Sequence, residues 1–374
     1  MTTLETFLGD IVDFFNGKAP QPDSDGEYTI YGSNGPIGLS KAFNHENAII
    51  LGRVGTCGSV EICEDRFWAS DNTIVAKPKD GFDIRYIYYR LLSTQLRNYA
   101  GGAAQPLLTQ AGLRRVKISL IKSFIEQKRI ADVLSAYDDL IENNRWRIAL
   151  LEQSARLLYK EWFVHQRFPG HEHVKITNGV PEGWETPHLS DLCHVGRGAS
   201  PRPINAYLDG ETPWLKIGDA TASKSPFILE TKECVTDDGV RKSIKLSPAS
   251  LILSNSATCG IPYFTGVDGC VHDGWLYFDQ FERINKFFLY CFLFFKQREL
   301  TQSVGDGSTQ KNLNTIVVGR LRVLLPKQNS LLELFNDIAE PLFSMIFSLA
   351  KENMTLQKAR DLLLPRLMSG EIVV

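Results

Sequence analysis

Length, composition and charge already exclude several classes of protein. The chain has 374 residues, 43% of them hydrophobic and 22% charged, which is ordinary for a globular protein and enough for two or more domains. The formal net charge of −2 excludes a surface that is basic throughout, so any nucleic-acid site must be a local cluster of Lys and Arg.

The first 121 residues are predicted to form one domain of mixed structure. Short β-rich runs such as residues 47–52 are separated by Gly and Pro, and a helix is expected at residues 84–96. A Gly-rich turn containing Gln105 follows, and a short apolar strand at residues 116–120 closes the domain. This mixture predicts a compact α/β or α+β fold for residues 1–121. The N-terminus lacks the basic and apolar regions of a signal peptide, so none is expected.

Residues 122–168 are predicted to contain one long helix. Ser123 and Glu126 have the spacing of a capping box, in which side chains satisfy the free N–H groups of the first turn. Residues 126–164 include neither Pro nor Gly. At 1.5 Å per residue such a helix would be roughly 60 Å long.

The remainder of the chain repeats this plan. Three sets of residues match at increasing offsets. At 181 residues (191 − 10), Asp10, Gly17 and Pro20 match Asp191, Gly198 and Pro201. At 202 residues (259 − 57), Cys57 and Asp71 match Cys259 and Asp273, and at 205 residues (310 − 105), Gln105 and Leu108 match Gln310 and Leu313. An ordered series with a growing offset indicates a tandem duplication. About 21 extra residues (202 − 181) are expected in the second copy, within residues 204–247.

The second copy predicts a second domain at residues 169–326, entered through a linker at residues 169–185. Its elements should be a strand near residues 250–255, a helix at 285–300, a Gly-rich turn with Gln310 and a strand at 321–325.

A second long helix is predicted at residues 327–374, where Ser330 and Glu333 again have capping-box spacing. Pro341 is expected to kink this helix or delay its start, and Pro365 to end it near the C-terminus.

Apolar residues spaced alternately four and three apart form a heptad seam on both helices, which predicts that the two helices pack together. Each seam contains one Asn, and an antiparallel pairing related by a pseudo-twofold axis would bring Asn144 beside Asn353. A lone buried amide costs roughly 1–3 kcal/mol, so mutual pairing favours this register over a parallel one. The predicted centre of the coiled coil is Ile141, Asn144, Ile148, Ile346, Leu349 and Asn353.

Two points about the seam remain open. Both Asn residues could instead be solvated at its edge. Arg360 also occupies a seam position, and its head group is expected to extend outward to solvent. An antiparallel pair would hold two similar domains at a fixed separation, which suits a bipartite site on duplex DNA.

Several stretches together resemble the specificity subunit of type I restriction–modification systems. They are FIEQKRIADVLSAYDDLIENNRWRIALLEQSARLLYKEWFV at residues 124–164, the Gly-rich turns with Gln105 and Gln310, PEGWE at 181–185 and LLLPRLMSGEI at 362–372. The resemblance covers nearly the whole chain.

The resemblance implies that each domain recognises one half of a split, asymmetric DNA site. The helices would set the spacing and dock two methyltransferase (M) subunits, which methylate adenine, and restriction (R) subunits would join through the M subunits. S-adenosylmethionine, ATP and Mg²⁺ would belong to those partners, with no cofactor in this chain.

Candidate DNA-contacting residues lie on polar or Gly-rich segments, because base recognition needs donors and acceptors on loops that enter a groove. In the first domain they are Tyr31, Ser33, Asn34, Arg53 and Gln105, and in the second Arg197, Arg202, Lys216, Asp219, Gln310 and Lys311. Turn chemistry alone could explain many of them, and either Gln could brace its loop. A basic cluster consists of Arg114, Arg115, Lys117, Lys122, Lys128 and Arg129; it could contact phosphates or an acidic partner.

No catalytic constellation is found in the sequence. The Asn/Asp-Pro-Pro-aromatic and cofactor-loop motifs of adenine methyltransferases are missing, as are P-loop and H-E-x-x-H patterns. Pro22 and Asp23 lack the Glu-x-Lys that would complete a nuclease site. His165, His171 and His173 are interpreted as part of a linker and the seven cysteines as reduced thiols, so no metal site is expected. The sequence thus predicts a non-catalytic, cytoplasmic specificity subunit. The alternatives are a stand-alone DNA-binding or anti-restriction protein, and a coiled-coil scaffold with protein-binding ends.

Overall fold

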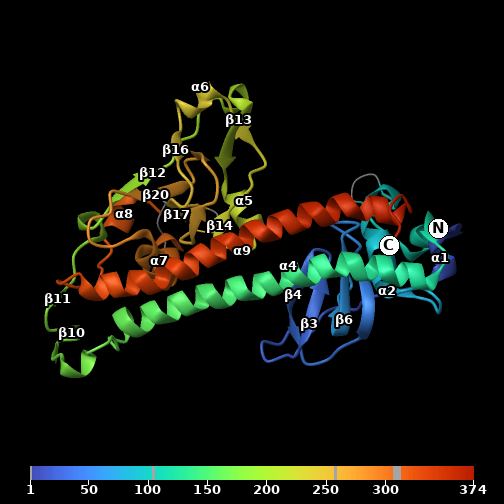
Figure 1. Ribbon diagram of the computed structural model, residues 1–374, viewed down its shortest axis with the longest axis horizontal. Coiled ribbons are helices and arrows are strands. Elements are labelled where there is room, and N and C mark those ends of the chain that lie inside the picture. The colour runs from blue at the N-terminus through green and yellow to red at the C-terminus, as the bar shows by residue number, and fades with distance from the viewer. Residues whose placement is uncertain (1, 103–105, 257–258, 306–312) are drawn as a thin grey trace. The chain divides into compact units, whose positions relative to one another are not determined.

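The computed structural model describes residues 2–102, 106–256, 259–305 and 313–374. They form two compact units, and each of two long helices contributes to both (Figure 1). Unit 1 consists of Met1–Leu140 and Thr355–Val374, and unit 2 of Ile141–Met354. The segments 122–168 and 327–374, expected as separate spacers, therefore complete the cores of the units.

Unit 1 is built around a six-stranded sheet with the order β2-β7-β5-β6-β3-β4. The strands are β2 (Val12–Asn16), β3 (Tyr28–Gly32), β4 (Gly35–Ser40), β5 (His45–Gly52), β6 (Val60–Ala69) and β7 (Thr73–Pro78). The central strand β5 ends in five consecutive buried residues because it is paired on both edges and covered on both faces. Smaller elements complete the unit: α1 (Leu8–Ile11), α2 (Ile84–Leu92), a 3₁₀ turn (Leu96–Tyr99), α3 (Gln110–Arg114), and the pair β1 (Thr3–Phe7) and β8 (Lys117–Ile121).

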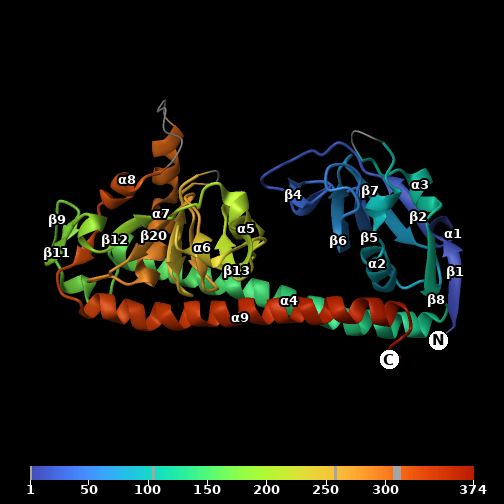
Figure 2. The same ribbon diagram turned by 90° about the horizontal axis from the view of Figure 1, so that it is seen from above.

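Unit 2 repeats this sheet as β12-β20-β17-β18-β14. Its strands are β12 (His194–Arg197), β14 (Phe227–Ile228), β17 (Leu251–Ser254), β18 (Pro262–Thr265) and β20 (Trp275–Asp279), and its helices α7 (Lys286–Gly305) and α8 (Thr315–Gly319). Short pairs join β9 (Ile176–Thr177) to β10 (Val180–Pro181) and β11 (Trp184–Glu185) to β21 (Leu325–Pro326). In Figure 2 the strands of each unit lie on one side of that unit's helix segments.

The predicted extra residues of the second copy build a second sheet in unit 2. Its order is β15-β13-β19-β16, from β13 (Leu208–Leu215), β15 (Cys234–Val235), β16 (Ile244–Leu246) and β19 (Gly269–Val271). Three of these strands, together with α5 (Ile217–Ala222) and α6 (Asp237–Val240), lie within residues 204–247. This confirms where the insertion lies.

The tandem duplication is visible in individual hydrogen bonds. The Leu8 N–H donates to the carbonyl oxygen of Val116, and Leu189 donates in the same way to Leu321. These residues are related by offsets of 181 (189 − 8) and 205 (321 − 116), as the sequence matches predict. The two units are therefore copies of one fold.

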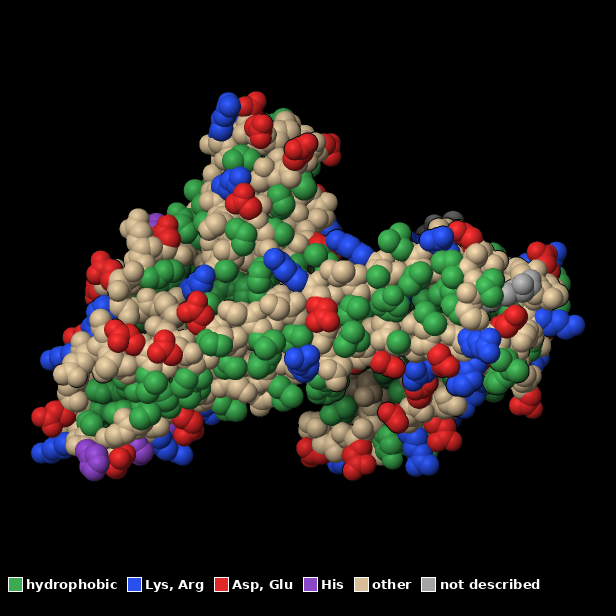
Figure 3. Space-filling model, viewed as in Figure 1, with side chains coloured by type: hydrophobic (Ala, Val, Ile, Leu, Met, Phe, Trp, Pro, Cys, Tyr) green, Lys and Arg blue, Asp and Glu red, His purple; other side chains and the backbone are tan. Residues whose placement is uncertain are grey.

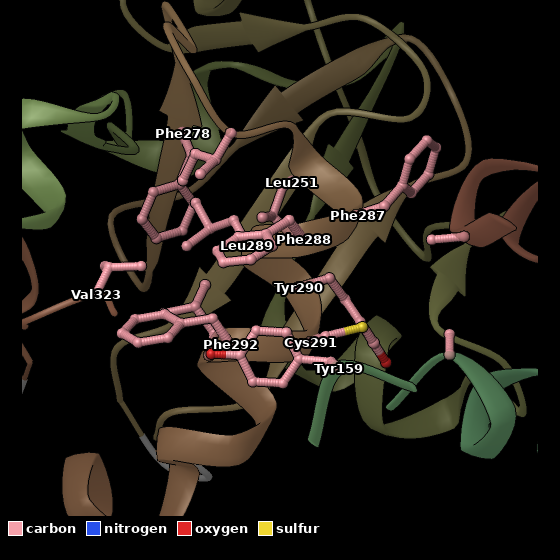
Figure 4. Packing of buried hydrophobic residues seen from close by; sticks show 14 of the residues in the cluster. Tyr159, Leu251, Phe278, Phe287, Phe288, Leu289, Tyr290, Cys291, Phe292 and Val323 are labelled. Atoms are coloured by element: carbon pink, nitrogen blue, oxygen red, sulfur yellow. The ribbon is translucent and has the colours of Figure 1, made fainter. Parts of the chain in front are cut away.

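The core of unit 2 is rich in aromatic rings, as Figure 4 shows around Tyr159 and Phe288. The Tyr159 and Phe288 rings meet edge to face with centroids 5.3 Å apart, and Phe163 contacts Phe288 in the same manner at 4.9 Å. Since Phe163 also packs on Phe335, this core joins the ends of both long helices to α7.

The long helices are α4 (Phe124–Tyr159), continued by a π-helical turn (Lys160–Val164), and α9 (Ser330–Met368). They run antiparallel within each unit. In unit 1 the early residue Leu134 shares a core with Leu364 and Leu367 near the end of α9. In unit 2 the late residue Trp162 packs on Phe335 near the start of α9, with ring centroids 6.2 Å apart.

Pro341 does not delay the start of α9, which begins at Ser330, and the helix ends at Met368, shortly after Pro365. Each proline deprives the carbonyl four residues earlier of its partner. Both prolines and the corresponding residues, Asp337 and Asp361, are exposed, so water can satisfy those carbonyls. Burial of the seam residues on the opposite face then outweighs the remaining cost.

Candidate nucleic-acid interface

Three loops meet at the end of β5 in unit 1. This loop cluster consists of residues 33–34, 53–59 and 70–72. The Ser33 hydroxyl donates to the Asn72 carbonyl oxygen at 2.6 Å, and the Ser59 hydroxyl donates to the Ser33 carbonyl oxygen at 2.5 Å. A Cβ at Gly52 would lie 2.5 Å from that same Ser33 oxygen, so only glycine allows this close approach. The loops are thus fixed to one another.

Arg53 lies at the centre of the unit 1 loop cluster. Its N–H donates to the Asn72 carbonyl oxygen at 3.0 Å, and its own carbonyl oxygen accepts from the Leu108 N–H at 3.1 Å. The side chain is half-buried, and Nε is buried without a partner among the described residues. Asn34 is exposed on the neighbouring turn. Arg53 and Asn34 therefore retain polar groups for a ligand.

Two other predicted contacts of this unit also have structural roles. The Tyr31 ring packs on Phe67 with centroids 5.6 Å apart, and burial, aided by the Cys63 thiol, raises its pKa well above the usual value. The Ser33 hydroxyl is engaged with the Asn72 backbone. Tyr31 and Ser33 thus have structural roles, and their assignment as base-contacting side chains stays a prediction.

The second loop cluster is formed by residues 197–202, 255 and 272–274 of unit 2. The Asp273 carboxylate accepts from the Ser200 hydroxyl at 2.7 Å and from Arg202 Nη2 at 3.3 Å, while its carbonyl oxygen accepts from Arg197 Nε at 3.0 Å. Burial alone would raise the pKa of Asp273, but the Ser200 hydrogen bond and the charges of His272 and both arginines lower it overall. One ionised carboxylate and its backbone therefore hold two exposed arginines.

Lys216 and Asp219 lie on the inserted part of unit 2. Lys216 Nζ is 2.5 Å from a Glu233 carboxylate oxygen and 4.8 Å from the centre of the Trp214 ring. Asp219 is only 6% exposed, and its two carboxylate oxygens accept from the N–H groups of Lys216 and Lys232. The Asp219 carboxylate therefore fixes the start of α5, and its role as a DNA contact stays a prediction.

Three predicted contacts, Gln105, Gln310 and Lys311, lie outside the described residues. All six residues of the basic cluster are exposed: Arg114, Arg115, Lys117, Lys122, Lys128 and Arg129. Lys117 is 4.0 Å from Glu5 and Lys128 is 3.6 Å from Asp132. On the face drawn in Figure 3, acidic and basic side chains are interspersed, as the small net charge suggests.

The helix pair buries all six predicted core residues, Ile141, Asn144, Ile148, Ile346, Leu349 and Asn353. Asn353 Nδ2 donates to the Ile141 carbonyl oxygen at 3.3 Å, less than one turn from Asn144. The amides do not bond to each other as expected: Asn144 Oδ1 accepts from Arg147 at 3.4 Å. Asn144 Nδ2 and Asn353 Oδ1 are buried and have no partner within the part of the chain that the structure describes.

Arg360 corrects a further expectation about the seam. Its guanidinium pairs with the carboxylates of Asp138 and Asp361, and the side chain is 19% exposed. Burial alone would lower the pKa of Arg360, but these carboxylates raise it. The head group is therefore held beside the seam and does not extend into solvent.

Across residues 2–102, 106–256, 259–305 and 313–374, no group of three or more His, Cys, Asp or Glu side chains is placed to hold a metal ion. All seven cysteines are free thiols. No helix in this part of the chain combines the length and apolar character needed to cross a membrane.

The structure thus defines a class of protein with two copies of one loop-presenting domain on a shared pair of helices. Residues 4–153 and 181–333 match the family model described as type I restriction modification DNA specificity domain. The chain is 30% identical over 346 residues to the MjaIX specificity subunit of Methanocaldococcus jannaschii, covering 88% of this chain and 78% of that one. It is 25% identical over 381 residues to the HindI specificity subunit of Haemophilus influenzae, covering 82% of each.

A solved structure shows the same fold. The S subunit of a type I restriction–modification system from M. genitalium has a TM-score of 0.63 at 18% identity and covers 98% of this chain and 96% of its own. The chain belongs to the specificity subunits of type I restriction–modification systems. Its function is sequence-specific recognition of DNA for such a system.

Proposed function

We propose that each unit contacts one half of a bipartite DNA target through its loop cluster, while the two long helices set the spacing and dock two methyltransferase subunits. Restriction subunits join through these partners. The chain itself breaks and forms no covalent bond. S-adenosylmethionine, ATP and Mg²⁺ are bound by the partners, and the complex works in the cytoplasm, where the partners and the target DNA meet.

One observation carries the assignment of one half-site to each unit. Arg53 and Asn255 follow the central strand in unit 1 and unit 2, and both have the same backbone bonds. The Asn255 N–H donates to Gly274 and its carbonyl oxygen accepts from Leu313, as Arg53 does with Asn72 and Leu108. One scaffold therefore presents different side chains in the two copies.

The side chains around these positions also differ between the copies. At an offset of 181 residues, Arg197 and Arg202 of unit 2 replace Asn16 and Gln21 of unit 1. Since base recognition depends on which donors and acceptors enter the groove, such substitutions support two different half-sites. An asymmetric target follows from this difference.

Docking of the partners is supported by apolar side chains left exposed on the helices. On α4, Trp146 is 65% and Leu150 59% exposed, and on α9 Leu334, Ile338 and Met345 are 40–47% exposed. These residues repeat at helical spacing on the faces turned away from the core of unit 2. Large apolar side chains left exposed at helical spacing support a protein-binding face on these helices.

The test is a map of methylated adenines in cells that express the chain with the methyltransferase subunit of its own system. A bipartite motif that depends on the chain is expected. Replacing residues 1–121 by those of a relative with another specificity should change one half of the motif only. Methylation without the chain, or a swap that alters both halves, would contradict the proposal.

A further inference from the structure

We propose that the guanidinium of Arg53 recognises a guanine base in the half-site contacted by unit 1. This inference rests on the proposed function, and it adds a specificity-determining residue and the base that this residue contacts. A guanidinium can donate two parallel hydrogen bonds to guanine O6 and N7, which is the commonest specific contact in the major groove.

The position of Arg53 is fixed before any ligand binds. The Arg53 backbone N–H donates to the Asn72 carbonyl oxygen, and the Arg53 carbonyl oxygen accepts from the Leu108 N–H. The Ser33 and Ser59 hydroxyls tie the flanking loops together. A base-contacting side chain needs such a rigid origin, because an error of about 1 Å at the backbone would misplace both hydrogen bonds.

The Arg53 side chain also has unsatisfied hydrogen-bonding capacity. Its Nε is buried without a partner, and no carboxylate in the described part of the chain pairs with its guanidinium. Two other arginines of unit 1 pair with carboxylates: Arg85 makes two hydrogen bonds to Glu64, at 2.6 and 2.7 Å, and Arg66 pairs with Glu46 at 3.1 Å. Arg90 Nε is also buried without a partner among the described residues, but Arg90 lies on α2 and not in the loop cluster. A buried donor left unpaired is costly, so its retention points to a ligand.

Comparison of the two copies shows that the fold does not require arginine at this position. The equivalent residue of unit 2 is Asn255, which is fully buried and donates from Nδ2 to the Asp273 carbonyl oxygen. The same backbone bonds are therefore compatible with a short, internally used amide. Among the described residues Arg53 makes no such internal side-chain bond, and its longer side chain is only half-buried.

The experiment uses the chain assembled with its methyltransferase subunits and compares Arg53→Ala, Arg53→Gln and wild type. The methylated motif is mapped first, and then affinity is measured for duplexes in which each base pair of the motif is substituted in turn. Both variants should lose discrimination at one G·C pair in one half-site, roughly 5- to 150-fold, with the other half unchanged. Arg53→Gln keeps a long polar side chain, so it guards against a packing defect in Arg53→Ala.

The control is Arg66→Ala, which removes an exposed arginine at the opposite end of β5 from Arg53 and should leave the motif unchanged. Equal weakening on all sequences, with the salt dependence reduced by about one phosphate contact, would make Arg53 a backbone contact and overturn the inference. A loss of discrimination at an A·T pair, or an unaltered motif, would also overturn the inference. In these cases the proposed function stands, whereas a wild-type complex without any sequence preference would defeat both.

Discussion

Asn353 of α9 donates a hydrogen bond from its side-chain Nδ2 to the backbone carbonyl oxygen of Ile141 in α4, at 3.3 Å. That oxygen already belongs to the hydrogen-bond ladder of its own helix, so the contact joins the two helices at a defined level. In another register of the two helices, the Asn353 amide would lie opposite apolar side chains of the seam. The bond therefore favours one register of the antiparallel pair.

The first prediction concerns this register. Asn353→Ala should lower the free energy of unfolding by about 1–2 kcal/mol, because it removes the interhelical bond and leaves a small cavity. The double variant Asn144→Leu/Asn353→Leu should recover most of that loss, since it also removes the two buried amide atoms that lack partners. Urea denaturation measures both. A double variant less stable than Asn353→Ala would show that the two amides stabilise the folded chain and do not act only by fixing the register of the helices.

The second prediction concerns the pH dependence of stability at His272. Burial lowers the pKa of this ring, Asp273 opposes the change, and Lys216 reinforces it. Its nitrogens lie 3.2 Å from the Ile217 backbone N and 2.6 Å from that of Gly274, so the neutral ring accepts a hydrogen bond in the folded state.

Because the folded-state pKa of His272 is below the unfolded value of about 6.5, the unfolded chain takes up a proton first as the pH falls. The contribution of His272 is fully present above that pH and is lost toward the lower folded pKa. His272→Gln should therefore flatten the decline of unfolding free energy below about pH 6.5, measured by denaturation at several pH values. His173→Gln is the control, since that side chain is 83% exposed. An equal effect of both substitutions would count against the buried ring.

The third prediction tests how unit 2 holds its arginines. Asp273→Asn keeps the shape of the side chain but removes the charge that faces Arg202 and Arg197. Affinity for the target should fall, and discrimination should weaken in the half-site contacted by unit 2 only. Competition binding with half-site variants measures this. The matched control is Asp71→Asn at the equivalent position of unit 1, where Asn16 and Gln21 stand in place of the arginines. Equal losses in both half-sites would contradict the prediction.

Much of the fold could be predicted from the sequence because a duplication and a heptad seam are periodic signals. The matches at 181, 202 and 205 residues located the equivalent hydrogen bonds of the two units, and the seam located Asn144 and Asn353 within one turn of each other. Both signals depend on local spacing, which the chain retains when it folds.

The remaining features depend on partners distant in the sequence. Arg360 seemed to need solvent, but Asp138 is 222 residues away and supplies its counter-ion. Tyr31 and Asp219 have polar groups next to glycines, yet the Tyr31 ring packs on Phe67 and the buried Asp219 carboxylate accepts from the Lys232 N–H. Composition cannot separate a polar side chain that braces a loop from one that the loop presents. Only the hydrogen-bond partners make this distinction.

The last prediction concerns the exposed apolar residues of α4. Trp146→Ala/Leu150→Ala should leave the melting temperature nearly unchanged, because these side chains are 65% and 59% exposed and contribute little to the core. Co-purification with the methyltransferase subunit should fall at least tenfold if they are central to the docking surface, since buried aromatic anchors dominate such interfaces. Ile37→Ala is the control, because Ile37 is equally exposed (59%) but lies on β4 of the unit 1 sheet. Undiminished co-purification by the double variant would move the docking surface away from this face of α4, whereas a lowered melting temperature would show that Trp146 packs more tightly than its exposure suggests.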